Sequence, residues 1–170
     1  TKSHRDYVKK LLGRLVFLQF LQKKGWMGVP ASNAKWEGGD KNYLSKLVDT
    51  YANNNRLLSD VLEPLFFNTL NEKRNGDIAD SILGENIKIP YLNGGLFDKD
   101  RIDELDIDFP YDYFKELMDF FAMYNFTIDE NDPEDSEIGI DPEMLGHIFE
   151  NLLEDNKDKG AFYTPKEIVS

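Results

Sequence analysis

The sequence contains no cysteine, and this absence removes several kinds of chemistry at once. Without thiols the chain forms no disulfide, builds no thiolate zinc site and offers no cysteine nucleophile. A cysteine-free chain is also typical of a reducing compartment. We therefore expect a cytoplasmic location.

Long apolar runs are absent as well. The most apolar stretch, Leu15–Leu21, is far shorter than the roughly 20 residues that a membrane-spanning helix needs. No charged and then apolar leader with a small-residue cleavage site precedes it, so we expect a soluble protein without a membrane partner. The 41% hydrophobic and 13% aromatic content is that of a folded globule, and 170 residues suffice for one domain with a core.

Histidine is scarce, since His4 and His147 are the only two. Without cysteine, two histidines give a transition metal too few nitrogen or sulfur ligands, and we interpret both as surface residues. The acidic stretch Asp129–Glu137 does not fit the calcium-loop pattern, because Pro133 and Ile140 occupy ligand positions. We predict no metal site.

Catalytic motifs are missing from the chain too. There is no phosphate-cradling GxxxxGK loop and no GxSxG elbow. The only acid-x-Lys triplet, Asp155-Asn156-Lys157, closes a predicted helix, whereas a metal-dependent nuclease needs such groups on neighbouring strands. We predict no catalytic residue in this chain.

Charge is present in quantity but unevenly placed. The net charge is −12 and the isoelectric point about 4.6, yet the first 24 residues carry seven lysines and arginines against one aspartate. This segment is therefore +6, which leaves −18 for the rest, and an acidic surface repels a phosphate backbone. Two interpretations stay open for the basic residues, a nucleic-acid contact or the solvated face of a helix. The candidates for such a contact are Lys9, Lys10, Arg14, Lys23 and Lys24.

Apolar residues recur at helical spacing along much of the chain. The pattern predicts helices over Tyr7–Lys24, Lys41–Asn53, Leu57–Leu70 and Tyr111–Met123. Pro64 removes a backbone donor inside the third of these and should kink it or divide it in two.

Other segments lack helical periodicity. Gly25–Asp40 and Asp98–Asp108 are predicted to be irregular. Alternation over Ile87–Tyr91 predicts a short strand, which Pro90 confines to a sheet edge or a strand end. A glycine-rich turn then leads to Leu96-Phe97, which predicts a small β-hairpin.

Two further helix starts are predicted near the C-terminus. Asp141-Pro142-Glu143 opens a helix that runs to Glu154. Thr164 can serve as N-cap, with Pro165 at the first helical position and Glu167 closing a capping box. Little more than one turn follows, which indicates a fragment of a larger, multidomain protein. The expected architecture is one mainly α, bundle-like domain with a small β-hairpin element.

Four stretches resemble a known family when they are taken together. They are Leu11–Trp26, Ile89–Phe97, Ile138–Leu153 and Gly160–Pro165. Their residues are similar to the helical region just upstream of the methyltransferase core in adenine-specific DNA methyltransferases of bacterial restriction-modification systems. The likeness is to type IIG fused restriction-modification enzymes and to phage-exclusion methyltransferases.

The resemblance implies a division of the chain and a place for the cofactor. Residues 1–159 would form a helical connector domain, and residues 160–170 would begin the methyltransferase core. Phe162, Tyr163, Thr164 and Pro165 would lie at the edge of the S-adenosylmethionine site. A helix start there suits a carboxylate, because free N–H groups and the helix dipole both favour negative charge.

The resemblance also implies what the chain leaves out. The family's glycine-rich cofactor loop and its Asn/Asp-Pro-Pro-Tyr catalytic tetrapeptide lie downstream, and this sequence contains no Pro-Pro. The isolated chain is thus expected to be inactive and to bind no cofactor. Double-stranded DNA, the methyltransferase core and any fused nuclease would be its partners in the full-length protein.

One alternative belongs to a different class of protein. The −18 remainder could make the chain a free-standing acidic interaction module that binds a basic partner or imitates DNA.

Overall fold

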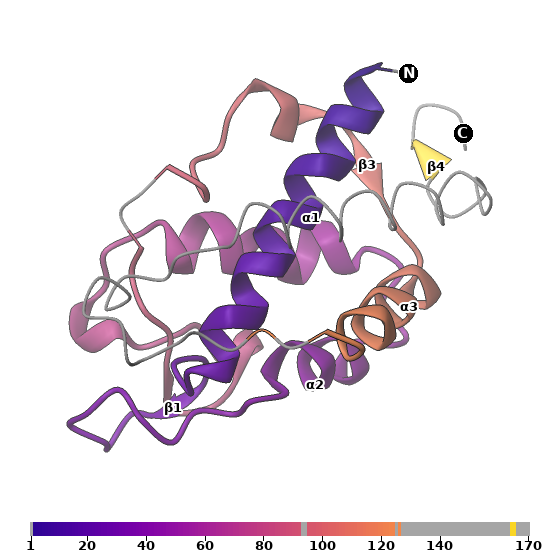
Figure 1. The fold of residues 1–170 in the computed structure, drawn as a ribbon. Coiled ribbons are helices and arrows are strands. Elements are labelled where there is room, and N and C mark those ends of the chain that lie inside the picture. Colours follow the sequence, from indigo (N-terminus) through magenta and orange to yellow (C-terminus); the bar gives the residue numbers. More distant parts are fainter. Residues whose placement is uncertain (1, 93–94, 125, 127–163, 166–170) are drawn as a thin grey trace.

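A computed structural model describes residues 2–92, 95–124, 126 and 164–165 (Figure 1). Helices dominate this part of the chain, together with two small antiparallel strand pairs. The prediction of a mainly α domain with a small β element is confirmed. The stretches Asp129–Glu137 and Asp141–Glu154 lie outside the described residues, as do the cofactor candidates Phe162 and Tyr163.

The longest element, α1 (Lys2–Lys23), crosses the domain (Figure 1), and every residue from 11 to 22 is buried or half-buried. Twelve of its residues are buried, and Leu12, Leu15 and Leu18 have no exposed area. A helix that is apolar nearly all round must be enclosed, because no single stripe can face the core. The helix begins earlier than the predicted Tyr7 and ends one residue before the predicted Lys24.

The end of α1 is a Schellman cap. Gly25 adopts a φ of 78°, in the left-handed region that favours glycine. Its N–H donates to the carbonyl of Gln22, and the N–H of Trp26 donates to the carbonyl of Leu21, at 3.0 and 3.2 Å. These two bonds satisfy carbonyls that a helix end otherwise leaves open. The predicted stop at Gly25 is confirmed.

The next helices differ in their hydrogen bonding. α2 (Tyr43–Thr50) is an ordinary α-helix, whereas η1 (Leu58–Leu62) and η2 (Pro64–Leu70) have the wider π-type pattern. Glu63 joins them with helical φ and ψ of −62° and −44°, and its N–H donates to the carbonyl of Leu58, five residues back. Pro64 has no N–H to donate, and the predicted helix is divided there into two segments, as expected. The backbone nevertheless stays helical across the boundary.

The predicted strand is present as β2 (Ile87–Lys88), but its partner is different from the expected one. It pairs antiparallel with β1 (Val29–Pro30), a segment predicted to be irregular, and not with Leu96-Phe97. The hairpin prediction is therefore wrong. A turn signal is local, whereas this pairing joins segments far apart in the sequence and depends on tertiary packing.

Two short 3₁₀ turns, η3 (Asn75–Asp77) and η4 (Ser81–Leu83), lie between η2 and β2. Arg74 holds this region together by donating to main-chain carbonyls. The acceptors are the carbonyls of Thr69, Glu72, Asp77, Ile78 and Ile89. In this segment, which forms only short turns, one guanidinium satisfies carbonyl groups that a longer helix or strand would pair with backbone N–H groups.

The acidic stretch Asp98–Asp108 is more regular than predicted. It contains the 3₁₀ turn η5 (Arg101–Glu104) and the strand β3 (Ile107–Asp108). β3 pairs antiparallel with β4 (Thr164–Pro165). Asp100 caps η5 in a reciprocal capping box with Asp103, which explains why an acidic segment holds a defined turn.

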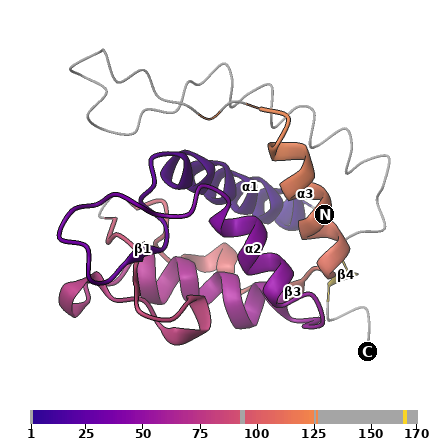
Figure 2. The same cartoon turned by 90° about the horizontal axis from the view of Figure 1, so that it is seen from below.

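The last described helix, α3 (Tyr111–Phe121), lies within the predicted range and buries an aromatic face. Phe109 stacks on Tyr113 with ring centroids 4.5 Å apart and meets Phe114 edge to face at 5.9 Å. α2 packs against both α1 and α3 (Figure 2). In the part of the chain that the structure describes, no helix is both long and apolar enough to cross a membrane.

Candidate functional site

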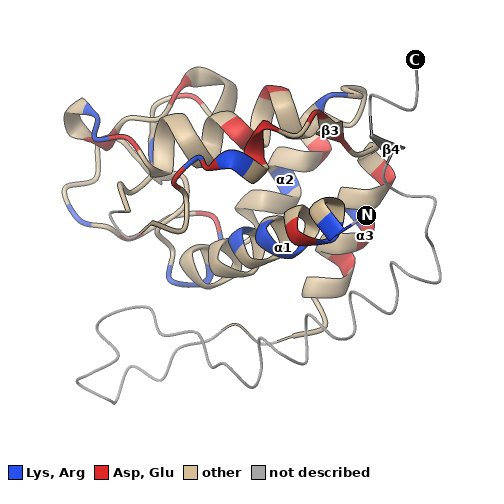
Figure 3. Cartoon of the chain, turned by 90° about the horizontal axis from the view of Figure 1, so that it is seen from above, with Lys and Arg blue, Asp and Glu red and all other residues tan. Residues whose placement is uncertain are grey.

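The basic residues singled out on α1 have very different surroundings. Lys9 and Lys23 are exposed, Lys10 is half-buried, and Arg14 is only 2% exposed. Every residue from 11 to 22 is buried or half-buried, so the exposed bases of α1 lie within residues 2–9 and at Lys23. Figure 3 colours the lysines and arginines along the helix blue. The prediction of a DNA contact is wrong for Arg14, because burial in the core keeps its side chain from a phosphate.

Arg14 forms a buried ion pair with Asp103. Its Nη1 donates to Oδ1 of Asp103 at 2.7 Å and its Nη2 donates to Oδ2 at 3.0 Å. The same guanidinium donates through Nε to the carbonyl of Leu96 at 2.9 Å and through Nη2 to the carbonyl of Asp98 at 3.0 Å. The planar fork of an arginine suits such bidentate binding, which an ammonium group cannot reproduce. We call Arg14, Asp103 and these two carbonyls the Arg14 clamp.

Asp103 of the Arg14 clamp also takes part in the hydrogen bonds that cap η5. Oδ2 of Asp103 also accepts from the N–H of Asp100 at 3.0 Å, and Oδ1 of Asp100 accepts from the N–H of Ile102 at 2.9 Å. Lys10 forms an ion pair with Asp100, and its Nζ lies 3.8 Å from Asp103. The hydrogen bond from Lys10 lowers the pKa of the Asp100 carboxyl. Lys10 and Arg14 are therefore both matched by carboxylates of the same segment.

Two aromatic rings complete the surroundings of the guanidinium. Its central carbon lies 5.6 Å from the ring centroid of Phe66 and 5.1 Å from that of Phe67. Such cation–π contacts favour a charge that is removed from water. Burying Arg14 is thus compensated by a carboxylate, two carbonyls and two ring faces.

The Arg14 clamp joins two of the stretches that carry the family resemblance. Leu11–Trp26 supplies the arginine, and the end of Ile89–Phe97 supplies one accepting carbonyl. In the described structure their shared role is to fix the segment after residue 95 against α1. The sequence does hold a signal for this pair: Arg14 is the only charge between Leu11 and Gln22, and an isolated charge within an apolar stretch is usually buried with a partner.

Two of the four cofactor candidates, Thr164 and Pro165, lie within the described residues as β4. Thr164 pairs with Asp108, and Pro165 pairs with Ile107. The expected helix start at Pro165 is therefore not observed, and Glu167 lies outside the described residues.

Asp108, beside β4, has a structural role at the start of η1. It is 8% exposed and accepts from the N–H of Leu58 at 3.2 Å, from Oγ of Ser59 at 2.9 Å and from the N–H of Phe109 at 3.0 Å. A carboxylate at this position satisfies open N–H groups of a helix start. These contacts tie β3 to η1.

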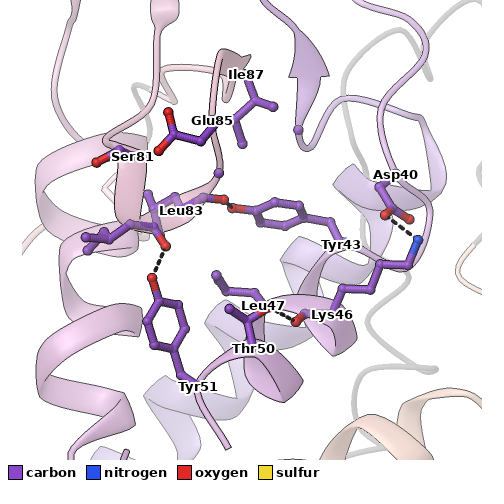
Figure 4. A pocket seen from close by; sticks show the side chains of 13 residues that line it. Asp40, Tyr43, Lys46, Leu47, Thr50, Tyr51, Ser81, Leu83, Glu85 and Ile87 are labelled. Atoms are coloured by element: carbon purple, nitrogen blue, oxygen red, sulfur yellow. Dashed lines mark hydrogen bonds and ion pairs between the residues drawn. The ribbon is translucent and has the colours of Figure 1, made fainter.

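A hollow of about 350 Å³ lies between α2 and residues 81–87 (Figure 4). The hydroxyls of Tyr43 and Tyr51 point across it and donate to the carbonyls of Leu83 and Ile82. Both phenols are thus engaged, and the described lining contains no histidine or cysteine to form a nucleophile and base pair. The described residues also contain no group of three or more metal-ligating side chains.

The buried phenols of Tyr7 and Tyr43 predict an alkaline limit to stability. Burial raises both pKa values above the ordinary 10.0, so the folded protein keeps these phenols protonated where the unfolded chain ionises them. The free energy of unfolding is then at its full value below about pH 10 and falls above it, by about 1.4 kcal/mol per pH unit for each phenol. Urea unfolding between about pH 8 and pH 11 measures this slope.

The Tyr43→Phe variant separates the two phenols. It should remove roughly half of the alkaline slope, while Tyr91→Phe, at a residue that is 37% exposed, serves as the matched control. An undiminished slope in Tyr43→Phe would contradict the assignment.

Comparison with known proteins finds a curated relative. The chain is 31% identical over 177 aligned residues to a protein of Methanocaldococcus jannaschii named "Putative type II restriction enzyme and methyltransferase RM.MjaORFECS2P". The alignment covers 98% of this chain and 14% of that protein's length. No family model and no solved structure matches. The chain is therefore similar, over nearly its whole length, to one segment of a much longer protein.

Proposed function

We propose that this chain is a helical connector segment of a restriction-modification DNA adenine methyltransferase of the bacterial cytoplasm. The full-length protein would transfer a methyl group from S-adenosylmethionine to adenine in double-stranded DNA. One observation carries the proposal, namely the 31% identity to the Methanocaldococcus jannaschii relative across 98% of the chain. The four family-like stretches, present in the family's order, support the adenine-specific class.

The described structure supports a scaffolding role for the segment. Its residues form a continuous apolar core around α1, and the Arg14 clamp fixes residues 96–103 against that helix. Within the described residues the polar groups serve caps, clamps and turns and do not converge on a reaction centre. In the proposal, residues 1–159 connect and residues 160–170 open the methyltransferase core. Its cofactor edge would be formed by Phe162, Tyr163, Thr164 and Pro165.

The proposal predicts a sharp difference between this chain and a longer product of its gene. The sequence after Ser170 should encode an Asn/Asp-Pro-Pro-aromatic tetrapeptide. The longer protein should transfer labelled methyl groups from S-adenosylmethionine to adenine in duplex DNA. Residues 1–170 alone should show no transfer and no binding of S-adenosylmethionine by calorimetry, because the groups that hold the cofactor and the flipped base belong to the core.

The controls separate the parts of this proposal. A longer protein with both prolines of the tetrapeptide changed to alanine should lose transfer. A stop codon directly after Ser170 would contradict the connector assignment. It would favour the alternative hypothesis of a free-standing acidic interaction module. Tight binding of S-adenosylmethionine by residues 1–170 would contradict the division of the chain.

A further inference from the structure

The loop of residues 31–39 is anchored to the end of α1. The N–H of Gly39 donates to the carbonyl of Gly25, and the N–H of Asp40 donates to the carbonyl of Met27, both at 2.9 Å. A Cβ at Gly39 would stand 2.4 Å from the carbonyl oxygen of Gly25, so only glycine permits this approach. The base of the loop is thus fixed beside the Schellman cap of α1, near β1 (Figure 1).

A buried lysine organises the same loop from the inside. Lys88 of β2 is 8% exposed, and its Nζ donates to the carbonyl of Asn33 at 2.7 Å and lies 4.5 Å from the ring centroid of Trp36. No carboxylate of the described residues lies within ion-pair distance of it. Asn33 also donates through Nδ2 to the carbonyl of Glu37 at 3.1 Å. The ammonium is therefore satisfied by dipoles and a ring face, which leaves its positive charge uncompensated.

Further bases lie on the end of α1 and on the loop itself, two segments that the bond from Gly39 to Gly25 joins. Lys23 and Lys35 are exposed, and the half-buried Lys24 lies 4.7 Å from the ring centroid of Trp26. The acids on these and the adjoining segments are Glu37 and Glu85, which are exposed, Asp77, whose carbonyl accepts from the N–H of Ile89, and Asp40, which Lys46 binds at 2.7 Å. We call this set the loop surface, and it consists of Lys23, Lys24, Trp26, Lys35, Trp36 and Lys88.

At the opposite end of α1 the bases all belong to that one helix. Lys10 and Arg14 are both bound by carboxylates of the segment that carries Asp100 and Asp103. The bases that remain exposed there are Lys2, Arg5 and Lys9. At the loop surface the bases come from three separate segments, namely the end of α1, the loop and β2.

We propose that the loop surface binds the phosphate backbone of double-stranded DNA, an inference that rests on the proposed function. In a chain of net charge −12 it gathers three solvent-accessible lysines, Lys23, Lys24 and Lys35, beside two indole rings, and the buried Lys88 adds an uncompensated positive charge behind the loop. Lysine ammonium groups bind phosphates without regard to base sequence, and indole N–H groups can donate to phosphate oxygens. Bases in the last turn of α1 also complement the helix dipole, but Lys35 and Lys88 lie outside that helix and have no such role.

The test compares two charge reversals of equal size. One variant carries Lys23→Glu, Lys24→Glu and Lys35→Glu, and its matched control carries Lys2→Glu, Arg5→Glu and Lys9→Glu. Fluorescence anisotropy with a labelled DNA duplex at low salt measures binding by the 170-residue chain. Circular dichroism verifies that both variants stay folded, which the surface placement of these side chains favours.

The wild-type chain should bind the duplex, with an affinity that falls as salt rises. The loop-surface variant should lose at least about tenfold in affinity, and its salt slope should drop by roughly three units, because each lysine that neutralises a phosphate contributes about one. The control should lose less than about threefold. Two duplexes of unrelated sequence should give the same result.

Three outcomes would overturn the inference. They are no duplex binding by the wild-type chain at low salt, an equal loss in both variants, or a larger loss in the control. None of these bears on methyl transfer by the longer protein, so this inference and the proposed function fail separately.

Discussion

Replacing Arg14 by methionine is expected to lower the free energy of unfolding by about 3–5 kcal/mol, since it breaks one side of a buried ion pair. The variant leaves the carboxylate of Asp103, whose side chain is 1% exposed, without its bidentate partner. It also removes the donor from the carbonyls of Leu96 and Asp98. Unpaired polar groups in a low dielectric account for this large cost. Urea unfolding followed by circular dichroism measures it.

Three companion variants define the origin of this effect. Arg5→Met, at an exposed position of the same helix, should change stability by less than about 0.5 kcal/mol. Arg14→Lys keeps the charge but not the fork, so it should fall between wild type and Arg14→Met. Adding Asp103→Asn to Arg14→Met should cost less than the sum of the two single changes, because both remove one interaction. A loss below about 1 kcal/mol in Arg14→Met would contradict the clamp.

Phe97→Ala should also cost about 3–5 kcal/mol, because it opens a cavity in the core. The side chain is 1% exposed, and its ring centroid lies 6.1 Å from that of Phe17 and 5.7 Å from that of Phe66. Its main-chain neighbours are anchored by Arg14, so the backbone can collapse little into the space that the ring leaves. The same urea measurement applies.

The expected loss at Phe97 has its own controls. Phe97→Leu keeps most of the apolar volume and should cost clearly less. Met123→Ala, at a residue that is 73% exposed, should be nearly neutral. Phe97→Ala combined with Arg14→Met should not be additive, because both side chains contact Phe66. A near-neutral Phe97→Ala would show that the ring of Phe97 does not contribute to the core as described.

The helices were predictable because their causes are local. The apolar period over residues 111–121 predicts α3, and Gly25 after Lys23 and Lys24 marks the end of α1. A period of 3.6 residues and a left-handed glycine both act within a few residues, so a single sequence displays them.

The strand partner and the loop anchor were not predictable in this way. β2 pairs with β1, and the loop of residues 31–39 rests on a contact between Gly39 and Gly25. In each contact the two segments are distant in sequence, and the composition of neither one indicates its partner. The packing of the whole domain decides which distant segments meet, and the propensities of neighbouring residues carry no information about it.

For the basic residues, too, the sequence predicted one part and the folded structure decided the rest. Composition shows that positive charge gathers in the first 24 residues, but counting charges treats Lys23 and Arg14 alike. Only the folded chain separates them, since one is exposed at the end of α1 and the other is buried against Asp103. It also adds Lys35 and Lys88, which the charge pattern does not single out.

The sequence by itself determined the mainly helical class, the end of α1 and the likeness to a methyltransferase segment, because periodicity, capping and motif order are properties of the chain read in one direction. The tertiary structure alone decided which bases face solvent, which strand pairs with β2 and what holds the segment after residue 95. These depend on contacts between distant residues, such as Arg14 and Asp103. Whether a charge is buried with a partner or left in water is settled only when those residues meet.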